Sequence, residues 1–279
     1  MHSKPKQSMP DQAVGQTSRT LNSTLVRHGT SLAATRSVPD ETPIALVFDG
    51  STQAVMMATE ADLEDFAIGF AITERIITQI DEITRIEIVP QAQGVEARIW
   101  LKADQSRNLA QRRRKSIGPT GCGLCGIESL EQAIWQSPNV ESETVFVAKD
   151  IENAMSALAA KQHLNAQTHA VHAAGFWTAT AGLVAAREDV GRHNALDKLI
   201  GSLVSSRTDP ATGMIVLTSR ISVELVQKAA IFGTPVITAI SAPTGLAVQT
   251  AETSGITLIG IARTDGFEIF THPERIGDH

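Results

Sequence analysis

The sequence predicts an α/β protein with a smaller α+β N-terminal half and a C-terminal α/β domain whose sheet is largely parallel. In the second half, short apolar runs alternate with segments of helical periodicity. This alternation is typical of parallel strands covered by helices on both faces. In the first half, several strand-like segments surround one helix-like segment. The implied divisions are a disordered tail (1–40), an α+β region (41–116), a flexible cysteine loop and connection (117–140) and the α/β domain (141–279).

Composition limits the classes of function. The chain has 279 residues and is 42% hydrophobic, which is enough for one large domain or two smaller ones. A net charge of −6 argues against a nucleic acid polymer as partner. Two cysteines make no disulfide framework and suit a reducing cytoplasm. The N-terminus has no secretory apolar core, and no apolar run reaches about 18 residues, so we expect a cytoplasmic protein without a membrane partner.

The N-terminal half is expected to begin with disorder. The first 40 residues are rich in Ser, Thr and Gln and lack a period, which predicts a disordered or loosely attached tail. Asp49-Gly50 then marks a hairpin turn, and Thr59 with Asp62 fits a capping box before a helix. The expected elements are strands at 43–48 and 53–57, a helix to about Ile77, strands at 83–89 and 95–101, and a basic segment at 108–115.

The C-terminal half continues with strands and helices in alternation. The expected elements are a helix from Asp150, a hairpin at 175–179 and 183–186, helices at 193–204, 223–231 and 244–252, and strands at 214–218, 235–240 and 256–261. Ligands of such sheets usually lie beyond the carboxyl ends of the strands. Three dipeptides that follow strands therefore form one candidate rim: Ser219-Arg220, Ser241-Ala242 and Arg263-Thr264.

The two cysteines form a C-x-x-C motif within Thr120–Gly126, which also holds three glycines. A basic run, Arg112–Lys115, precedes it. Nearby cations lower the pKa of a thiol, and the thiolate is the reactive form, so one interpretation is sulfur chemistry on Cys122 and Cys125. A structural zinc site, even one completed by a distant His-x-x-His pair, and a turn with two idle thiols are the alternatives. The motif lacks the surroundings of a zinc deaminase or a thioredoxin-like dithiol.

Two polar clusters are candidates for ligand binding. In Arg187–Lys198, His193 and Asp197 are four residues apart and could share a helix face. Arg192 and His193 could face a phosphate, or the cluster could be a solvated helix start. Ser219–Ser222 follows a strand and opens a helix, where backbone N–H groups and Arg220 suit a phosphate. Ser222 could equally be an ordinary helix N-cap.

Four motifs together resemble a known family. They are TGCGLCG at 120–126, EDVGRHNALDK at 188–198, SRISVELVQK at 219–228 and THPER at 271–275. In this order they are similar to the formate dehydrogenase accessory sulfurtransferase family (FdhD/NarQ). The resemblance covers residues 43–275 and implies a cytidine-deaminase-like fold, without the deaminase metal signature, for the second half.

The resemblance also implies a function. Such a protein accepts sulfur from a cysteine desulfurase as a cysteine persulfide. It delivers the sulfur to the molybdenum (or tungsten) bis-molybdopterin guanine dinucleotide cofactor, which makes formate dehydrogenase active. Cys122 would carry the persulfide, Cys125 would assist, and no metal would bind the protein directly. The residues expected to bind the cofactor, including its guanine nucleotide part, are Arg192, His193, Ser219, Arg220, Ile261, Ala262, Arg263, Thr264, Asp265, Gly266 and His272.

The family resemblance further implies a homodimer. The alternative function is a chaperone that carries the molybdenum cofactor without transferring sulfur. The two functions differ in what they require of Cys122, because only the sulfurtransferase needs its thiolate.

Overall fold

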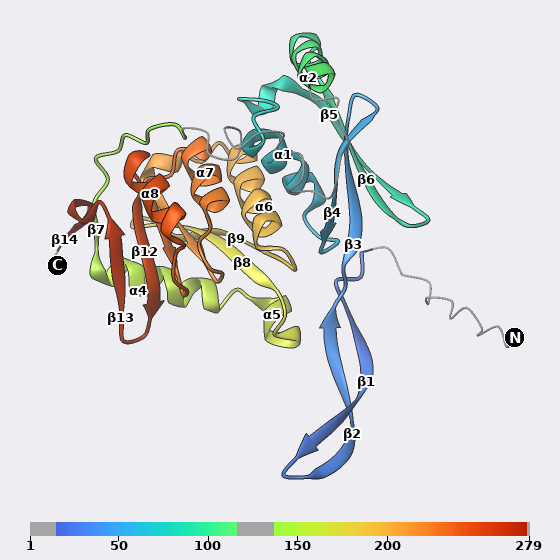
Figure 1. Cartoon of the computed structure of the whole chain (residues 1–279), viewed down its shortest axis with the longest axis vertical. Helices are drawn as coiled ribbons and strands as arrows, with labels where there is room; N and C mark the ends of the chain where they lie inside the picture. The colour runs from blue at the N-terminus through green and yellow to red at the C-terminus, as the bar shows by residue number, and fades with distance from the viewer. Residues whose placement is uncertain (1–14, 116–136, 278–279) are drawn as a thin grey trace, which may run out of the picture.

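The computed structural model describes residues 15–115 and 137–277. It contains a protruding arm, a four-stranded sheet with helix α1, and a six-stranded sheet covered by helices (Figure 1). Within the described residues, no helix is long and apolar enough to span a membrane.

The arm is an antiparallel hairpin of β1 (Ser18–Arg27) and β2 (Thr30–Pro39). The expectation of a disordered tail to residue 40 is therefore wrong for these residues. His28 and Gly29 both adopt positive φ, 48° and 79°, as a tight two-residue hairpin turn requires. Leu21 and Leu25 of β1 lie on the same face as Leu32 of β2, because side chains alternate between the two faces of a β-strand. The polar composition concealed this pattern.

The four-stranded sheet has the order β4-β3-β6-β5, with β3 and β6 parallel and the other two pairings antiparallel. The strands are β3 (Thr42–Phe48), β4 (Ser51–Ala58), β5 (Ile83–Gln91) and β6 (Gly94–Leu101). These confirm the expected strands. The helical elements are α1 (Leu63–Thr73), the short η1 (Ile80–Glu82) and α2 (Ala103–Lys115).

The helix α1 starts differently from the expectation. Asp62 has a left-handed backbone and its side chain caps no backbone N–H. The backbone N–H of Thr59 instead donates to Asp189 at 3.0 Å. The predicted capping box is therefore wrong, and α1 ends at Thr73 rather than near Ile77.

The six-stranded sheet has the order β13-β12-β11-β10-β8-β9. Its strands are β8 (His172–Thr178), β9 (Gly182–Asp189), β10 (Gly213–Leu217), β11 (Val236–Ala239), β12 (Thr257–Arg263) and β13 (Gly266–Thr271), and a separate parallel pair joins β7 (Phe146–Val147) to β14 (Ile276–Gly277). Only β10–β11 and β11–β12 are parallel. The prediction of a largely parallel sheet is corrected to a mixed sheet. Short hairpins at β8–β9 and β12–β13 force antiparallel pairing.

Helices cover both faces of this sheet (Figure 1). They are α4 (Ala148–Ala159), α5 (His163–Thr168), α6 (Arg192–Ser205), α7 (Val223–Phe232) and α8 (Gly245–Thr253), with η2 (Pro210–Thr212) and η3 (Pro273–Arg275) in connections. Along β10, Met214 and Val216 pack in the core cluster that includes α4, while Ile215 and Leu217 pack in the cluster with α6 and α7. The alternation of side chains along a strand explains this division.

The two halves join where α1 crosses α6. The crossing is close because each helix contributes a glycine at the contact. A Cβ on Gly69 would lie 1.7 Å from the carbonyl oxygen of Asp197, and one on Gly201 would lie 1.8 Å from that of Asp65. The N-terminal half is therefore packed directly on the helix that opens with Arg192 and His193. The expected divisions after residues 116 and 140 stay predictions.

Candidate functional site

The loops after β10, β11 and β12 form one continuous rim. The backbone N–H of Ile221 donates to Ala242 at 3.4 Å, and that of Ile261 donates to Ser241 at 3.3 Å. Neighbouring strands lie about 4.8 Å apart, so the first and third loops are separated by about 10 Å. The three loops that the sequence analysis grouped as a candidate rim are therefore adjacent.

The N-termini of α6 and α7 meet at this rim. His193 Nε2 lies 3.5 Å from the Ser222 hydroxyl and 3.9 Å from a carboxylate oxygen of Glu224. Ser222 is the N-cap residue of α7, yet its side chain makes no capping hydrogen bond. Two clusters that are far apart in the sequence are thus brought together through His193 and Ser222.

His193 is electrically neutral in this setting. Burial lowers its pKa to about 4, with Arg192 and Lys228 acting in the same direction and Glu224 and Glu74 opposing them. Burial, and then Arg192, also lowers the pKa of His172. A neutral imidazole can donate or accept a hydrogen bond but contributes no charge to anion binding. The positive charge at this end of the rim therefore comes from Arg192.

Arg192 offers an unused hydrogen-bond donor. Its Nε is buried, and none of the described residues accepts a hydrogen bond from it. Buried polar groups are nearly always paired, so an orphaned guanidinium nitrogen needs an explanation. Arg220 and Arg263 are exposed on the first and third loops of the rim. These three arginines fit a ligand with phosphate groups.

The pKa of Glu224 is lowered. Burial alone would raise it, but several other interactions that lower it are together stronger. The opposing causes are hydrogen bonds from Ser222 and from its own backbone, together with His193 and Arg192. Glu224 is thus ionised beside the imidazole. It partly offsets the charge of Arg192.

Other charged residues of the 188–198 motif are buried and structural. Asp189 and Lys198 are fully buried and form an ion pair at 2.6 Å. Asp189 also accepts hydrogen bonds from Gly191 N–H at 2.7 Å and from the Asn194 amide at 2.9 Å. Lys198 donates to the carbonyl of Thr59 at 2.8 Å. These contacts fix the turn that presents Arg192 and His193, so the interpretation of a solvated helix start does not hold for Asp189 and Lys198.

Asp197 forms a second buried connection between the halves. The sequence suggested that it could share a helix face with His193, but its carboxylate bonds to Lys228 at 2.9 Å and to Thr73 at 2.8 Å. Lys228 also bonds to Glu74 at 3.2 Å. Burial raises the pKa of Asp197 despite Lys228. The sequence spacing alone could not reveal this interaction, because Thr73 and Lys228 lie far away in the chain.

The predicted segment Ile261–Gly266 consists of the end of β12 and the turn into β13. Ala262 is buried, whereas the turn residues Thr264 and Asp265 are exposed. Ile261 adopts a φ of 53°, a costly conformation for a β-branched residue. The hydrogen bond of its N–H to Ser241 holds it there. This strained residue keeps the turn at the rim.

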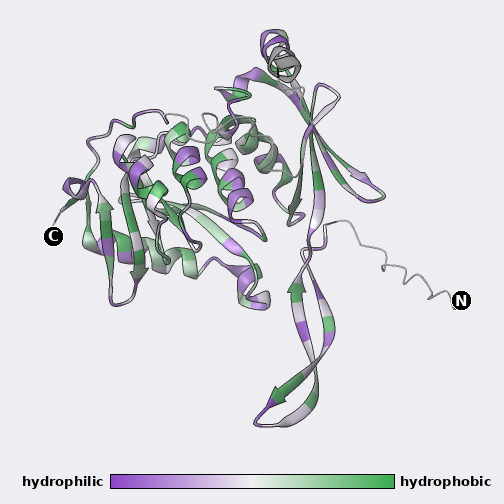
Figure 2. Ribbon diagram, viewed as in Figure 1, coloured by the Kyte–Doolittle hydropathy of each residue, from purple (hydrophilic) through white to green (hydrophobic). Residues whose placement is uncertain are grey.

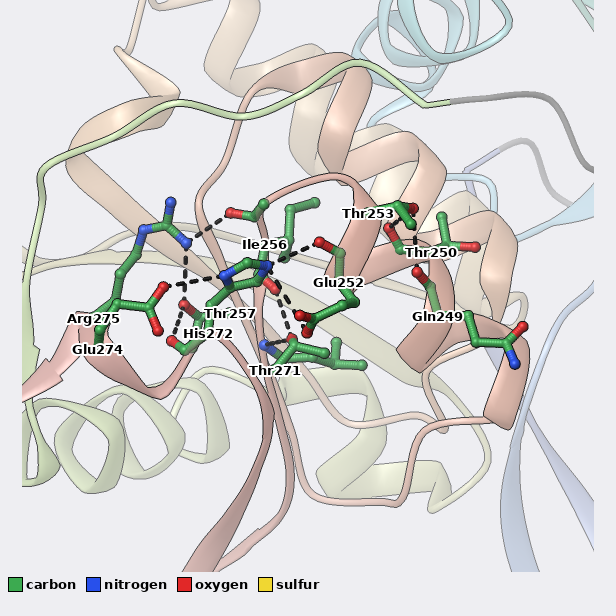
Figure 3. Close-up of polar contacts among 12 residues, drawn as sticks. Gln249, Thr250, Glu252, Thr253, Ile256, Thr257, Thr271, His272, Glu274 and Arg275 are labelled. Atoms are coloured by element: carbon green, nitrogen blue, oxygen red, sulfur yellow. Dashed lines mark hydrogen bonds and ion pairs between the residues drawn. The ribbon is translucent and has the colours of Figure 1, made fainter.

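Two of the residues predicted to bind the cofactor are less able than the others to contact a ligand at the rim. The Ser219 side chain is buried and donates to the carbonyl of Arg220 at 3.1 Å. His272 lies beside Thr257 at the start of β12, which is the opposite end of the strand from the rim (Figure 3). Its ring nitrogens face the Glu252 carbonyl at 2.9 Å and Glu274 at 3.1 Å. The structure therefore does not bring His272 together with the other candidates.

The 271–275 motif instead ties the C-terminus to the sheet. The Thr271 hydroxyl donates to the carbonyl of Ile256 at 2.7 Å, and Arg275 donates to that of Gly255 at 2.6 Å. Thr257 donates to the carbonyl of His272 at 2.9 Å. The contacts in Figure 3 are those of a structural connection.

Comparison with known proteins shows which family the chain belongs to. The model of the FdhD/NarQ family matches residues 39–277. The chain belongs to the FdhD/NarQ family. The sulfur carrier protein FdhD of Agrobacterium fabrum is 51% identical over 91% of this chain and 94% of its own length. That of Cupriavidus necator is 43% identical over 90% and 87%, respectively.

A solved structure shows the same fold. It is the crystal structure of a protein from Desulfotalea psychrophila described as a formate dehydrogenase accessory protein. The two structures agree with a TM-score of 0.73 and 26% identity, over 94% of this chain and all of the other. The family resemblance of the four sequence motifs is therefore confirmed.

The FdhD/NarQ cysteine motif, Cys122 and Cys125, lies outside the described residues. Within residues 15–115 and 137–277, no group of three His, Cys, Asp or Glu side chains is arranged to hold a metal ion. A structural zinc site that involves Cys122 and Cys125 therefore stays a prediction. Sequence analysis missed His172 and the orphaned Arg192 Nε as features of the rim, since neither follows from residue spacing.

The low pKa of His193 predicts a pH dependence of stability. Its pKa in the folded protein, about 4, is below the ordinary histidine value of 6.5, so the unfolded chain binds more protons between these pH values. The stabilisation is present above pH 6.5 and is lost as pH falls toward 4, by about 3 kcal/mol in total. His193→Gln should therefore lose less stability than the wild type between pH 7.5 and 4.5 in urea unfolding. The exposed His163→Gln control should follow the wild type, and equal losses in wild type and His193→Gln would refute the assignment.

Proposed function

We propose that this chain is a sulfurtransferase of the cytoplasm that serves formate dehydrogenase. It accepts sulfur from a cysteine desulfurase as a persulfide on Cys122 and transfers it to the bis-molybdopterin guanine dinucleotide cofactor of molybdenum or tungsten. It works as a homodimer. The observation that supports this proposal most strongly is membership in a family whose relatives are named sulfur carrier proteins.

The first step is an exchange between two persulfides. The Cys122 thiolate attacks the outer sulfur of the desulfurase persulfide, whose S–S bond breaks as the donor cysteine leaves as a thiolate. One persulfide replaces another, so no external oxidant or reductant is needed. The glycines around Cys122 permit backbone conformations that help one cysteine reach two large partners. Cys125 can take over the sulfur by the same exchange.

The second step delivers the outer sulfur atom to the metal of the bound substrate. The Cys122 persulfide S–S bond breaks and the cysteine leaves as a thiolate. The metal, in its reduced tetravalent state, supplies two electrons and is oxidised to the hexavalent state. The sulfur is reduced to a sulfido ligand. Atoms and electrons balance without a further reactant, and the thiolate is ready for another cycle.

The rim is the proposed binding surface for the phosphate and guanine part of this substrate. Three features support that assignment: the orphaned Nε of Arg192, the exposed guanidinium groups of Arg220 and Arg263, and the position of the loops beyond the carboxyl ends of β10–β12. His193 would donate or accept a hydrogen bond as a neutral ring. His272 lies at the opposite end of β12 from the rim, so its proposed role is structural.

The test is formate dehydrogenase activity in cells that lack their own copy of this protein. Wild type should restore the activity, and Cys122→Ala should lower it by at least about a hundredfold, because removing an essential nucleophile removes the transfer step. The Cys122→Ala protein should unfold at the wild-type temperature. Full restoration by Cys122→Ala would favour the cofactor chaperone instead.

A further inference from the structure

The arm formed by β1 and β2 leaves an apolar face uncovered. Opposite residues of an antiparallel pair share a face, and Leu25 is opposite Leu32. Leu21 lies on the same face, two alternations along β1. These leucines are 38%, 56% and 47% exposed in the order Leu25, Leu32 and Leu21. Figure 2 shows apolar segments on both strands of the arm, which projects from the body.

The arm cannot account for its own stability. A two-stranded hairpin is marginally stable in water unless it packs against something else. Nearly all residues of β1 and the distal half of β2 are exposed. The region matched by the family model starts at residue 39, where the arm ends. The apolar face of the arm therefore needs a partner.

Charge identifies the kind of partner. Residues 18–39 contain Arg19, Arg27 and Arg36 and no acidic residue, whereas the whole chain has a net charge of −6. Arg19 pairs with Asp40 at the base, but no ion pair among the described residues engages Arg27 or Arg36. Arg27 lies at the tip and on the apolar face, because it pairs with Thr30 in the same register. An acidic surface is complementary to this basic tip.

Such a surface lies at the base of the arm. Glu60 accepts a hydrogen bond from the backbone of Gly15 at 2.9 Å, just before β1. Glu60, Asp62, Glu64 and Asp65 line an open cleft of about 430 Å³ together with Leu63 and Ile88. Asp65 is bound to Arg187, whereas no ion pair within the described parts of the chain engages Glu60 or Glu64. Acidic groups are thus available where the arm begins.

We propose that the β1–β2 arm is the dimer contact, packing its apolar face against the same face of the arm of a second copy. When the two-fold axis is perpendicular to the length of the arms, the two arms run antiparallel, and the tip of each reaches the base of the other. The leucines then bury each other, and the basic Arg27 meets the acidic Glu60–Asp65 cleft of the second copy. The leucine face provides every second residue of two ten-residue strands. The acidic cleft of the second copy extends this contact toward the roughly 20–30 residues per partner of a stable interface.

This proposal deepens the homodimer included in the proposed function and does not depend on sulfur transfer. It is tested by sedimentation equilibrium of the full chain. Wild type should have twice the 29.8 kDa chain mass at micromolar concentration. The double variant Leu25→Asp/Leu32→Asp should be monomeric, with the dissociation constant raised at least about a hundredfold, because four carboxylates would meet in an apolar contact. A wild-type monomer would overturn the proposal whatever the protein does with sulfur.

The matched control changes the opposite face of the same arm. Val26 is 63% exposed and is opposite Ser31 rather than a leucine. Val26→Asp should therefore remain dimeric. If Val26→Asp dissociates as much as Leu25→Asp/Leu32→Asp does, the dimer contact does not lie on the leucine face. A double variant that stays dimeric would also overturn this assignment. Circular dichroism and thermal unfolding of the body should be unchanged, since all three positions are exposed.

A cross-linking experiment gives an independent measurement. Ser23 lies on the leucine face near the middle of β1, and Thr24 lies on the other face. In a chain with both native cysteines replaced by serine, Ser23→Cys should be joined to its counterpart by a short bis-maleimide. Thr24→Cys should give at least about tenfold less cross-linked dimer, because faces of a sheet point in opposite directions. Equal yields at the two positions would contradict the packing.

Discussion

Lys198→Met should destabilise the protein by about 3–5 kcal/mol, because it leaves the carboxylate of Asp189 buried without its counter-charge. Both side chains are fully buried and lie 2.6 Å apart. Lys198 also satisfies the carbonyl of Thr59, which would lose its donor. The free energy of unfolding from urea titration measures the effect. The loss should be accompanied by weaker docking of the N-terminal half, since Thr59 and Asp189 lie on different sides of the junction.

The matched control removes a lysine from an exposed pair. Lys149 bonds to Glu152 at 2.8 Å, with side chains 70% and 46% exposed. Lys149→Met should cost less than about 1 kcal/mol, as exposed ion pairs usually do. If Lys198→Met costs no more than Lys149→Met, then the buried pair does not hold the two halves together.

Gly201→Ala should be the second severely destabilising substitution. A methyl group there would lie 1.8 Å from the carbonyl oxygen of Asp65 and 2.7 Å from its carbonyl carbon, so α1 and α6 must move apart. Overpacking of this kind costs about 1–3 kcal/mol, occasionally more. We expect about 3 kcal/mol or more, because the obstructing atoms are backbone. Displacing α1 would also strain the bond between Thr73 and Asp197. Thermal and urea unfolding measure the loss.

Gly245→Ala makes the same chemical change at an open position. Gly245 is the first residue of α8, and a Cβ there would meet nothing within 4 Å. Alanine in place of glycine at a compatible site stabilises by about 0.4–1 kcal/mol. A Gly201→Ala protein as stable as Gly245→Ala would show that the helices do not cross as closely as described.

The local patterns explain why much of the fold could be predicted. The alternation of Val95, Ala97, Ile99 and Leu101 predicted a half-buried strand, and all four are buried in β6. The helix expected at 193–204 is α6, which extends one residue further at each end. Periodicity reports which face of an element is apolar. It does not report strand direction, so the mixed pairing in the six-stranded sheet could not be predicted from it.

The candidate site could be predicted only in part. The rim followed from the order of strands and loops. The sequence could not separate Arg192 and His193, which face the rim, from Asp189, Asp197 and Lys198, which are buried between the two halves. Their partners Thr59, Thr73 and Lys228 are distant in the chain. The arm was missed because its strands are exposed on both faces, where polar residues dilute the two-residue period.

The central claim is that Cys122 carries sulfur, and intact-mass spectrometry tests it most directly. The purified chain is incubated with a cysteine desulfurase and cysteine, alongside Cys122→Ala and Cys125→Ala. We predict that the wild type and Cys125→Ala gain one sulfur atom, about 32 Da, which reductant removes because persulfides are reversible. Cys122→Ala should gain none. No gain by the wild type, from a desulfurase that is active on another acceptor, would contradict the account.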